Sequence, residues 1–492
     1  MSEQLIHIEF DPARTLRDQV REHLVSMILS GKFPSDVALP SSRTMAKMLG
    51  VSRNTIVIAY EDLVDLDYLV SKPRLGYFVN TSFHEKELIQ KVTPLSDRQQ
   101  IDWVERFKTR PGNKRNIVKP SNWARFEYPF IYGQIEPGLF PERMWRECSM
   151  KAASSYTAKH WAHDWVDGDD PQLIEQLRTK IFPRRGIYAE ASEILITIGT
   201  QNSLYLIANL LMNANVKVGL EDPGFPDAKN IFSTFNANLS YFPVDDEGLV
   251  LNEETIPRLA QLDYLYLTPS HQVPTGVVMS AHRRKLLLEL AEQHDIILIE
   301  DDYDVEINLQ QDAQLALSAI DEQNRVIYVG SMSKAIAPGL RLGFMVADEE
   351  LINEARALRR LMYRHAPIHN QRQLAFFFQQ GYYDTYLRRI REHYADKHRM
   401  IIAAIAEHLE GFAILSNSAG ATSIWLRAPA HIDTEQLSWR AAKNGILIES
   451  GAIHFANSED HPKNFLRLGF AAIPLEKIEP GIAALSRLIE QY

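Results

Sequence analysis

Tyr328-Val329-Gly330-Ser331-Met332-Ser333-Lys334 sets how the large part of this chain folds, because an apolar strand runs there straight into a turn of small residues. The turn presents one lysine, and Ala337-Pro338-Gly339-Leu340-Arg341 follows it with an arginine. A lysine in this setting can form a Schiff base with an aldehyde, and the serines and the arginine could hold a phosphate. Most lysines are solvated surface residues, so the interpretation depends on the rest of the chain.

Four further apolar runs share this strand-like character and alternate with helical patterns. With the run that ends at Val329, they cover residues 193–198, 216–220, 264–268, 296–300 and 325–329. Buried strands separated by helices predict an α/β domain with a largely parallel sheet. Ligands of such sheets gather at the carboxyl ends of the strands, so the residues after each run are the candidates for a binding site.

Each run is followed by a distinctive polar or aromatic group. In chain order these are the helix-opening turn Gly199-Thr200-Gln201, the aromatic Phe225, the donors His271 and Gln272, the pair Asp301 and Tyr303, and the lysine turn. Pyridoxal phosphate (PLP) needs a lysine for its aldehyde, a carboxylate beside its ring nitrogen and a phosphate cradle, and these groups supply all three. A nucleotide would need a GxGxxG or P-loop motif in the right context, and structural zinc would need a close His/Cys cluster; the sequence has neither, so we expect no metal.

Residues 11–80 have the pattern of a small DNA-reading module. Apolar residues recur at helical spacing from Thr15 to Leu29, Gly31 stops that helix, and serines can cap two further helices on either side of a tight turn at Gly50. Two short strands joined through Lys72-Pro73-Arg74 follow. Helix, glycine turn, helix and a two-stranded wing predict a small α+β winged helix-turn-helix.

The third helix of this module begins with side chains that can bond phosphates or base edges. We expect the first turn of this helix to enter a major groove and three further cations to meet the DNA backbone: Ser52, Arg53, Asn54 and Thr55 in the first group, and Arg43, Lys72 and Arg74 in the second. Nine basic and eight acidic residues lie between 11 and 80, so net charge alone does not exclude a plain packing module. The acidic residues of the third helix, however, lie at its far end from Arg53.

The composition is that of a globular protein, with 45% apolar and 24% charged residues in 492, a length that predicts two or three domains. One cysteine suits a reducing compartment, and neither a signal peptide nor a bilayer-length apolar run is present; these features predict a cytoplasmic protein with no membrane contact. A net charge of −10 excludes a chain that coats nucleic acid with its whole surface. Between residues 81 and 118 the periodicity fades, which predicts a linker.

The small module resembles the winged helix-turn-helix of GntR-family transcription regulators. The resemblance rests on the segments Leu39–Arg43, Leu49–Thr55 and Ala59–Leu63. It implies DNA contacts at Arg43, Ser52, Arg53, Asn54 and Thr55 and at the wing residue Gly76.

Residues from about 125 to 490 resemble the fold-type-I, class I aminotransferases, which implies a large α/β PLP-binding domain with a smaller C-terminal α+β subdomain. On this resemblance Lys334 is the Schiff-base lysine, Asp301 partners the pyridine nitrogen, and Tyr303 contacts the ring hydroxyl together with His271 or Gln272. Phe225 stacks on the ring, and the phosphate contacts come from Gly199, Thr200, Gln201, Ser331, Ser333 and Arg341. The segment Asn464–Phe470 matches the one whose arginine takes a substrate carboxylate, so Arg467 is expected to bind the acidic group of a ligand.

Together the two parts resemble the MocR family of bacterial regulators, with a winged helix-turn-helix at 11–80, a linker at 81–118 and an aminotransferase-like effector domain at 119–492. The resemblance implies a transcriptional regulator whose PLP internal aldimine senses an amino compound by transaldimination. An amino acid, an ω-amino acid or an aminosulfonate all fit as the effector. It also implies a homodimer, head-to-tail and domain-swapped, that binds double-stranded DNA at paired half-sites and is nucleoid-associated when bound.

Two departures from the aminotransferase pattern bear on catalysis. The turn at residues 169–174 has Asp and Ile where these enzymes commonly have Gly and Arg, and the loop at 272–276 lacks the usual Asn-Pro-Thr-Gly. Both favour a sensor over an ordinary transaminase. The alternative, a catalytically active PLP-dependent aminotransferase with an appended DNA-binding domain, stays open at this point, as does residual transaminase activity.

Overall fold

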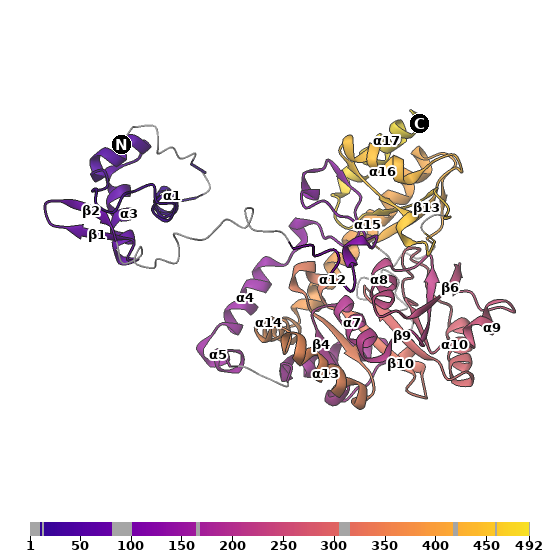
Figure 1. The fold of residues 1–492 in the computed structure, drawn as a ribbon. Helices are drawn as coiled ribbons and strands as arrows, with labels where there is room; N and C mark the ends of the chain where they lie inside the picture. The colour runs from indigo at the N-terminus through magenta and orange to yellow at the C-terminus, as the bar shows by residue number, and fades with distance from the viewer. Residues whose placement is uncertain are drawn as a thin grey trace. The chain divides into compact units, whose positions relative to one another are not determined.

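The computed structural model describes residues 10–11, 14–80, 101–163, 168–304, 315–416, 422–457 and 460–491. The chain divides into two compact units, a small unit Met1–Phe107 and a large unit Lys108–Tyr492. Figure 1 colours the small unit from indigo to purple and the large unit from purple through orange to yellow.

Among the described residues, the small unit contains three helices and a two-stranded antiparallel sheet. They are α1 (Leu16–Leu29), α2 (Ser42–Leu49), α3 (Arg53–Asp65), β1 (Leu69–Lys72) and β2 (Gly76–Val79). Each helix begins behind a hydroxyl side chain that accepts a backbone N–H three residues further on, because the first N–H groups of a helix have no partner within it: the caps are Thr15, Ser41 and Ser52. Gly50 ends α2 at φ +67°. The predicted winged helix-turn-helix is confirmed.

The core of the small unit lies between α1 and α3. Val20 and Leu24 from α1 and Ile56 and Leu63 from α3 are fully buried. Tyr60 is also fully buried, and its hydroxyl donates to the carbonyl oxygen of Pro40 at 2.8 Å, which ties α3 to the start of α2. The buried faces leave the first turn of α3 outside the core.

The predicted linker of 81–118 is described only from residue 101 onward, because residues 81–100 lie outside the described residues. Its last part contacts the large unit. Lys114 Nζ donates to Ser233 Oγ, Arg115 forms an ion pair with Glu435 at 2.6 Å, and Asn230 Nδ2 donates to the carbonyl oxygen of Arg115 at 2.8 Å. Residues 114–116 therefore lie on the body of the large unit.

The large unit is built on an eight-stranded sheet in the order β4-β11-β10-β9-β8-β5-β6-β7. Its strands are β4 (Ile194–Thr197), β5 (Lys217–Asp222), β6 (Asn238–Asp245), β7 (Gly248–Leu249), β8 (Tyr264–Leu267), β9 (Ile297–Asp302), β10 (Val326–Ser331) and β11 (Gly343–Val346). The five predicted strands are β4, β5, β8, β9 and β10. The sheet is mixed, since β11 lies antiparallel between β10 and β4 while β10, β9, β8, β5 and β6 run parallel.

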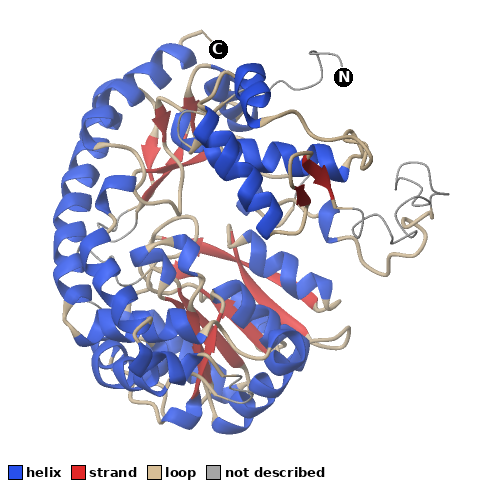
Figure 2. Cartoon of the chain, turned by 90° about the vertical axis from the view of Figure 1, so that its left-hand side faces the viewer, coloured by secondary structure: helices blue, strands red, loops and turns tan. Residues whose placement is uncertain are grey.

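Helices cover both faces of this sheet, as Figure 2 shows in blue around the red strands. One face packs on α7 (Thr200–Leu211), α8 (Pro226–Thr234) and α13 (Glu349–Tyr363); the other packs on α6 (Pro171–Gln176), α10 (Ala281–Gln293), α14 (Ile368–Gln379) and α15 (Tyr382–His408). The remaining helices are α4 (Glu142–Ala152), α5 (Ser155–Trp161), α9 (Thr255–Leu259), α11 (Leu317–Ile320) and α12 (Ser333–Ile336). Among the described residues, no helix combines the length and the apolar content needed to cross a membrane.

Alternation along β9 determines which of its carboxylates faces which layer. Ile299 packs in the α7–α8–α13 layer, whereas Leu298 packs on the α10 side. Because side chains alternate between the two faces of a strand, Asp301 follows Ile299 to the α7–α8 side, while Glu300 and Asp302 follow Leu298. Of these three consecutive acidic residues, Asp301 is therefore the one whose side chain lies on the face of the sheet covered by α7 and α8.

A second, four-stranded sheet forms the smaller C-terminal part, in the order β12-β13-β16-β15. Its strands are β12 (Ala413–Ile414), β13 (Ser423–Arg427), β15 (Glu449–Ser450) and β16 (Phe465–Gly469), with α16 (Thr434–Lys443) and α17 (Ile478–Ile489) packed nearby; β14 (Ile446–Leu447) pairs with β3 (Tyr128–Pro129). The antiparallel register places Glu449 opposite Arg467. The expected α/β domain with a smaller C-terminal α+β subdomain is confirmed.

Candidate functional site

A pocket of about 460 Å³ lies at the carboxyl ends of β9 and β10 and at the beginnings of α7 and α8. Ten residues that the sequence analysis singled out line it: Gly199, Thr200, Gln201, Phe225, Asp301, Tyr303, Ser331, Lys334, Arg341 and Arg467. The structure therefore brings the predicted lysine, the predicted carboxylate, the phosphate cradle and the predicted acid-binding arginine into one cavity.

Lys334 enters this pocket from α12, directly after the end of β10. Its Nζ donates to Tyr132 Oη at 3.0 Å and lies 3.9 Å from the centre of the Tyr303 ring. Burial lowers the pKa of Lys334 to about 8, because a charged ammonium loses hydration inside the pocket. A lysine with a lowered pKa has a larger share of neutral amine near pH 7, which is the form that attacks an aldehyde.

Asp301 presents one carboxylate oxygen that the protein does not use. Its Oδ2 accepts from Tyr266 Oη at 2.8 Å, while its Oδ1 is buried and has no hydrogen-bond partner among the described residues. Burial raises the pKa of Asp301 to about 7. The neighbouring acids are engaged in the opposite layer: Glu300 accepts backbone N–H groups of α11, and Asp302 pairs with Arg185 at 2.9 Å.

The turn before α7 offers an anion site. The helix begins at Thr200 with no side chain capping its first N–H groups, and Thr200 Oγ1 is buried without a partner in the described part of the chain. Gly199 has φ +112°, and a Cβ there would lie 3.2 Å from Nη2 of Arg341, so glycine suits both the backbone angle and the space. Free helix N–H groups, a hydroxyl and a guanidinium are the donors that hold a phosphate.

Arg467 lies at the other end of the pocket, in the middle of β16, and is 1% exposed. Its Nη2 forms an ion pair with Glu449 Oε1 at 2.6 Å, and the same oxygen lies 2.9 Å from Nε2 of His454. Although burial opposes ionisation, Arg467 and His454 hold the pKa of Glu449 down at about 2. Neither Nε nor Nη2 of Arg467 makes a hydrogen bond among the described residues, so the guanidinium keeps donors available for a ligand.

His271 and Gln272 are not brought into the pocket. His271 Nδ1 lies 2.8 Å from Asp304 Oδ1, and Gln272 Nε2 donates to the carbonyl oxygen of Pro223 at 2.8 Å. Gln272 Oε1 accepts from Thr275 as well, so these polar groups stabilise the loop and join it to Pro223 and Asp304 in neighbouring segments. Val273 is the residue of this loop that lines the cavity. Ser333 begins α12.

Four residues around the pocket were not predicted from the sequence: Lys119, Tyr132, Asp227 and Glu449. Tyr132 and Glu449 each end an apolar run, Phe130-Ile131 and Ile446-Leu447-Ile448, and a polar group that ends a buried run is the signal that could have found them. Asp227 accepts a hydrogen bond from Gln201 Nε2, and Lys119 follows an exposed segment without any such signal.

The first turn of α3 forms the candidate DNA interface of the small unit. Arg43, Ser52, Arg53 and Asn54 are exposed, and Thr55 is half-buried. Ser52 Oγ accepts the backbone N–H of Thr55 at 3.1 Å, so Ser52 caps the helix while its surface stays open. No acidic residue lies in this first turn. The exposed cations and amide can therefore reach a nucleic acid without like-charge repulsion from their own helix.

The wing carries the other predicted contacts. Lys72 Nζ lies 4.5 Å from the centre of the Phe78 ring, and Arg74 and Gly76 adopt positive φ angles of 65° and 107° in the turn between the strands. At the far end of α3, Asp62 is paired with Arg17 at 2.5 Å. Acidic charge is thus partly neutralised at the end of α3 that lies away from Arg53.

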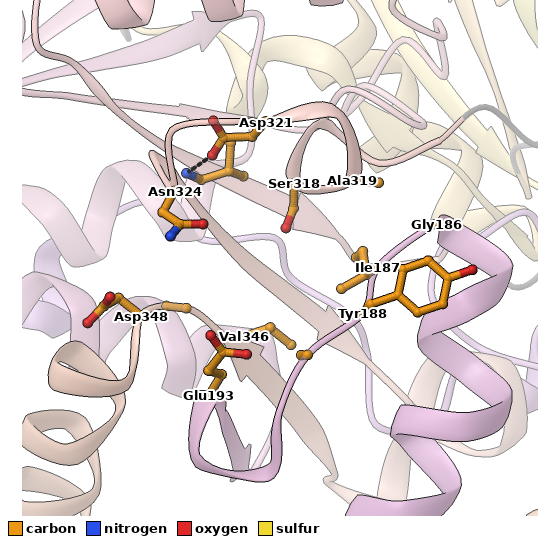
Figure 3. Close-up of a pocket in the computed structure, with 13 residues that line it drawn as sticks. Gly186, Ile187, Tyr188, Glu193, Ser318, Ala319, Asp321, Asn324, Val346 and Asp348 are labelled. Carbon is orange, nitrogen blue, oxygen red and sulfur yellow. Dashed lines mark hydrogen bonds between the residues drawn. The ribbon is translucent and has the colours of Figure 1, made fainter.

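A second cavity, of about 260 Å³, is lined by acidic side chains but does not have the character of a site (Figure 3). Asp321 accepts the backbone N–H groups of Arg325 and Val326, Asp348 caps α13, and Glu193 accepts the N–H of Glu190. These carboxylates stabilise turns and helix ends. Within the described residues, no group of three or more His, Cys, Asp or Glu could hold a metal ion.

Two family descriptions match the chain: "Bacterial regulatory proteins, gntR family" over residues 16–79 and "Aminotransferase class I and II" over residues 146–485. The HTH-type transcriptional regulator TauR of Rhodobacter capsulatus is 37% identical over 96% of each chain. The probable rhizopine catabolism regulatory protein MocR of Rhizobium meliloti is 28% identical over 98% of this chain and 95% of its own. Among solved structures, a kynurenine aminotransferase of Pyrococcus horikoshii is 26% identical with a TM-score of 0.68, covering 83% of this chain and 99% of that one.

The aminotransferase class I and II family depends on pyridoxal phosphate, and the residues present fit this cofactor. The unpartnered Oδ1 of Asp301 can accept a hydrogen bond from a protonated ring nitrogen. The unpartnered Thr200 hydroxyl lies in the turn that a phosphate would occupy. Lys334 lies in the same cavity as both groups. Two orphaned buried atoms are thus provided with partners by the same molecule.

Proposed function

The chain belongs to the family of HTH-type transcriptional regulators that join a GntR-type DNA-binding domain to an aminotransferase class I and II domain, and we propose that it senses an amine that competes with Lys334 for bound pyridoxal phosphate. The observation that carries the proposal is the convergence of Lys334, the free oxygen of Asp301 and the acid-binding Arg467 in one pocket.

Pyridoxal phosphate, when bound, supplies an aldehyde carbon that reacts reversibly with amines. With the cofactor bound, Lys334 would hold that carbon, Asp301 would keep the ring nitrogen protonated, and Thr200 and Arg341 would hold the phosphate. An amine ligand would compete with Lys334, and Tyr132 Oη, which accepts from Lys334 Nζ at 3.0 Å, would receive the freed lysine. The ligand changes transcription only to the extent that it favours one arrangement of Lys334 and its surroundings over another.

Arg467 limits the ligand to amines that also carry an acidic group. A guanidinium binds a carboxylate or a sulfonate through paired donors, and its position across the pocket from the cofactor cradle sets the spacing between the two ligand groups. An amino acid, an ω-amino acid and an aminosulfonate remain the proposed classes of effector.

We further infer that two chains act together on DNA. One chain carries one recognition helix, so an operator with paired half-sites needs a homodimer, for which we propose the head-to-tail, domain-swapped arrangement. Residues 11–80 would be the DNA-reading domain, 81–118 the linker and 119–492 the effector domain. Arg43, Ser52, Arg53, Asn54, Thr55, Lys72, Arg74 and Gly76 would make the DNA contacts.

The test is a titration of the protein loaded with pyridoxal phosphate, followed by its visible absorbance, against a panel of amines with and without an acidic group. We expect the acidic amines to shift the absorbance at lower concentration than the plain amines, and the same amines to change binding to operator DNA. A protein whose DNA binding is indifferent to every amine that shifts the absorbance would contradict the sensor function.

A working aminotransferase is the second candidate, because the pocket retains a lysine, a ring-nitrogen carboxylate and a phosphate cradle together. Incubation with an amino acid and 2-oxoglutarate separates the two functions. Multiple turnovers per active site would establish an enzyme with an appended DNA-binding domain, whereas a single half-reaction or none supports the sensor.

A further inference from the structure

Three cations surround the ring of Tyr132. Arg467 Cζ lies 4.0 Å from the ring centre, Lys334 Nζ lies 4.8 Å from it, and Lys119 Nζ lies 5.7 Å from it. The proposed function gives Lys334 to the cofactor and Arg467 to the acidic group of the ligand. Lys119 lines the same pocket and has no role in that scheme.

The ammonium of Lys119 has no bonded counter-ion among the described residues, although the carboxylates of Glu449 and Asp227 attract its charge at longer range. In the described ranges of the chain it makes neither an ion pair nor a hydrogen bond, and its contact with the Tyr132 ring is a weak attraction. A Cβ on Gly133 would lie 2.9 Å from Lys119 Nζ, so the ammonium lies directly on the backbone of the pocket wall. Lys119 is an exposed residue overall, and it lines the pocket together with Gly133.

Charge balance at this end of the pocket makes Lys119 necessary. Glu449, which stays ionised, already neutralises Arg467. An incoming acid would therefore bring a second negative charge to one arginine, which is unfavourable away from water. Lys119 offers a second positive charge beside Arg467. Desolvation and the charge of Arg467 lower the pKa of Lys119 and outweigh Glu449 and Asp227, which raise it; an anionic ligand would raise it further.

The other acid in this region is not bonded to Lys119. Asp227 lines the pocket, and its Oδ2 accepts a hydrogen bond from Gln201. Among the described residues, neither Asp227 nor Glu449 forms an ion pair with Lys119, although both attract its charge.

The position of Lys119 in the chain gives it a second property. It follows residues 114–116, which bond to Ser233, Asn230 and Glu435 of the large unit, and Ile117 also lines the pocket. This short segment, 114–119, is the part of the connection toward the small unit that touches the ligand cavity.

We propose that Lys119 and Arg467 together bind the acidic group of the ligand, and that Lys119 thereby fixes the segment 114–119 when the pocket is filled. The inference rests on the proposed function, since it concerns the ligand of the same site. The ligand class is an amine with one carboxylate or sulfonate, whose oxygens are shared between the guanidinium and the ammonium.

The test compares the unsubstituted protein with Lys119→Gln, Lys119→Arg and the control Lys108→Gln, which removes an exposed lysine of the same connection. Each protein, loaded with pyridoxal phosphate, is titrated with 3-aminopropanoate, 2-aminoethanesulfonate and propylamine. We expect Lys119→Gln to weaken binding of both acidic probes by about 10- to 100-fold and to leave propylamine within about twofold, while Lys119→Arg and Lys108→Gln stay near the unsubstituted protein. The two acidic probes distinguish a carboxylate ligand from a sulfonate ligand.

Hydrogen–deuterium exchange of the backbone amides of residues 114–118 tests whether a filled pocket fixes the segment 114–119. Saturation with an acidic probe should slow exchange there in the unsubstituted protein and not in Lys119→Gln at matched occupancy. The proposed role of Lys119 would be overturned, but not the proposed function, if Lys119→Gln bound the acidic probes as tightly as the unsubstituted protein. The same would follow if the substitution weakened binding of propylamine equally. An unsubstituted protein whose absorbance responds to none of the three amines would overturn the proposed function as well. Retained cofactor absorbance in Lys119→Gln shows that the variant is folded.

Discussion

The cofactor end of the pocket, at Asp301 and Thr200, and the ligand end, at Arg467, differ in whether the protein supplies a charged partner. At the cofactor end, Asp301 Oδ1 and Thr200 Oγ1 are buried without partners in the described structure. At the ligand end, Arg467 forms an ion pair with Glu449, and Glu449 with His454, although Nε and Nη2 of Arg467 make no hydrogen bond there. The carboxylate at one end has no charged partner, whereas the arginine at the other is electrically balanced before any ligand arrives.

This difference separates a resident group from an exchangeable one. An unpaired buried polar atom costs about 1–3 kcal/mol, so occupation of the cofactor end recovers that free energy and favours permanent binding. An acid at the ligand end has to share Arg467 with Glu449, so its net gain is smaller and its binding is reversible. A sensor needs both behaviours in adjoining parts of one cavity.

Replacement of Lys334 should have the largest effect, because it removes the covalent attachment at the resident end. We expect Lys334→Ala to abolish the visible absorbance of the bound cofactor, and dialysis to remove the remaining cofactor. Lys285→Ala is the matched control, since Lys285 is an exposed lysine on α10 with only a 3.8 Å pair to Glu289. A Lys334→Ala protein that keeps the visible band would refute the assignment of the site.

Asp301→Asn should weaken cofactor binding by about 10- to 100-fold, because a hydrogen bond to a charged group contributes about 1.5–3 kcal/mol. Its Oδ1 has no protein partner among the described residues, so the melting temperature of the cofactor-free protein should change little. Equilibrium titration with pyridoxal phosphate and a thermal melt measure the two quantities. A sharply lower melting temperature of the cofactor-free variant with unchanged cofactor affinity would show that Asp301 stabilises the protein itself and does not bind the cofactor.

Glu449→Gln removes the competitor at the exchangeable end. We expect affinity for 3-aminopropanoate and 2-aminoethanesulfonate to rise by about tenfold, which corresponds to about 1.4 kcal/mol, and affinity for propylamine to stay constant. The control is Glu479→Gln, which removes the partner of His408 on the surface at 2.8 Å. Weaker binding of the acidic amines would mean that Glu449 orients Arg467 more than it competes.

The smallest effect concerns pH. Because the pKa of Lys334 is lowered to about 8, its ammonium predominates below that pH and its reactive amine above it. The amine fraction rises from about one tenth at pH 7 to about one half at pH 8. The rate of cofactor uptake by cofactor-free protein, followed at the visible band, should therefore rise about fivefold over this interval and level off above pH 9. A midpoint near the ordinary lysine value would contradict the burial of the amine.

Much of the fold could be predicted from local sequence patterns. The site residues could be predicted only where they directly follow a strand of the sheet. The helices of the small unit were predictable because Ser41, Gly50 and Ser52 cap or stop them locally. The meeting of these strand-end residues in one pocket was predictable because the carboxyl ends of parallel strands lie at one edge of the sheet. Short β11 was missed, since a run of four residues lies close to the lysine turn and carries no periodicity of its own.

The ligand end was harder to predict, because its residues meet only through the tertiary fold. Tyr132 and Lys334 are 202 positions apart in the sequence. Glu449 can be recognised as part of the site only once the fold places it opposite Arg467 on the neighbouring strand. His271 and Gln272 had the right chemistry and followed a predicted strand, yet the protein itself supplies their partners, Asp304 for His271 and Thr275 for Gln272. Hydrophobic periodicity predicts which element a side chain belongs to. It does not predict with which residue that side chain forms a hydrogen bond.

Helix α15 has a mechanical consequence for the large unit. Its 27 residues contain no glycine or proline and measure about 40 Å, so it behaves as a stiff strut. At its end, Ser486 Oγ of α17 donates to the carbonyl oxygen of His408, and from its middle Lys397 Nζ donates to the carbonyl oxygen of Ala471, which joins the helix to the smaller C-terminal part. At its start it meets α14 across Gly381, at φ +71°. Over a stiff helix of about 40 Å, a rotation of a few degrees at Gly381 would displace the opposite end by a few ångströms.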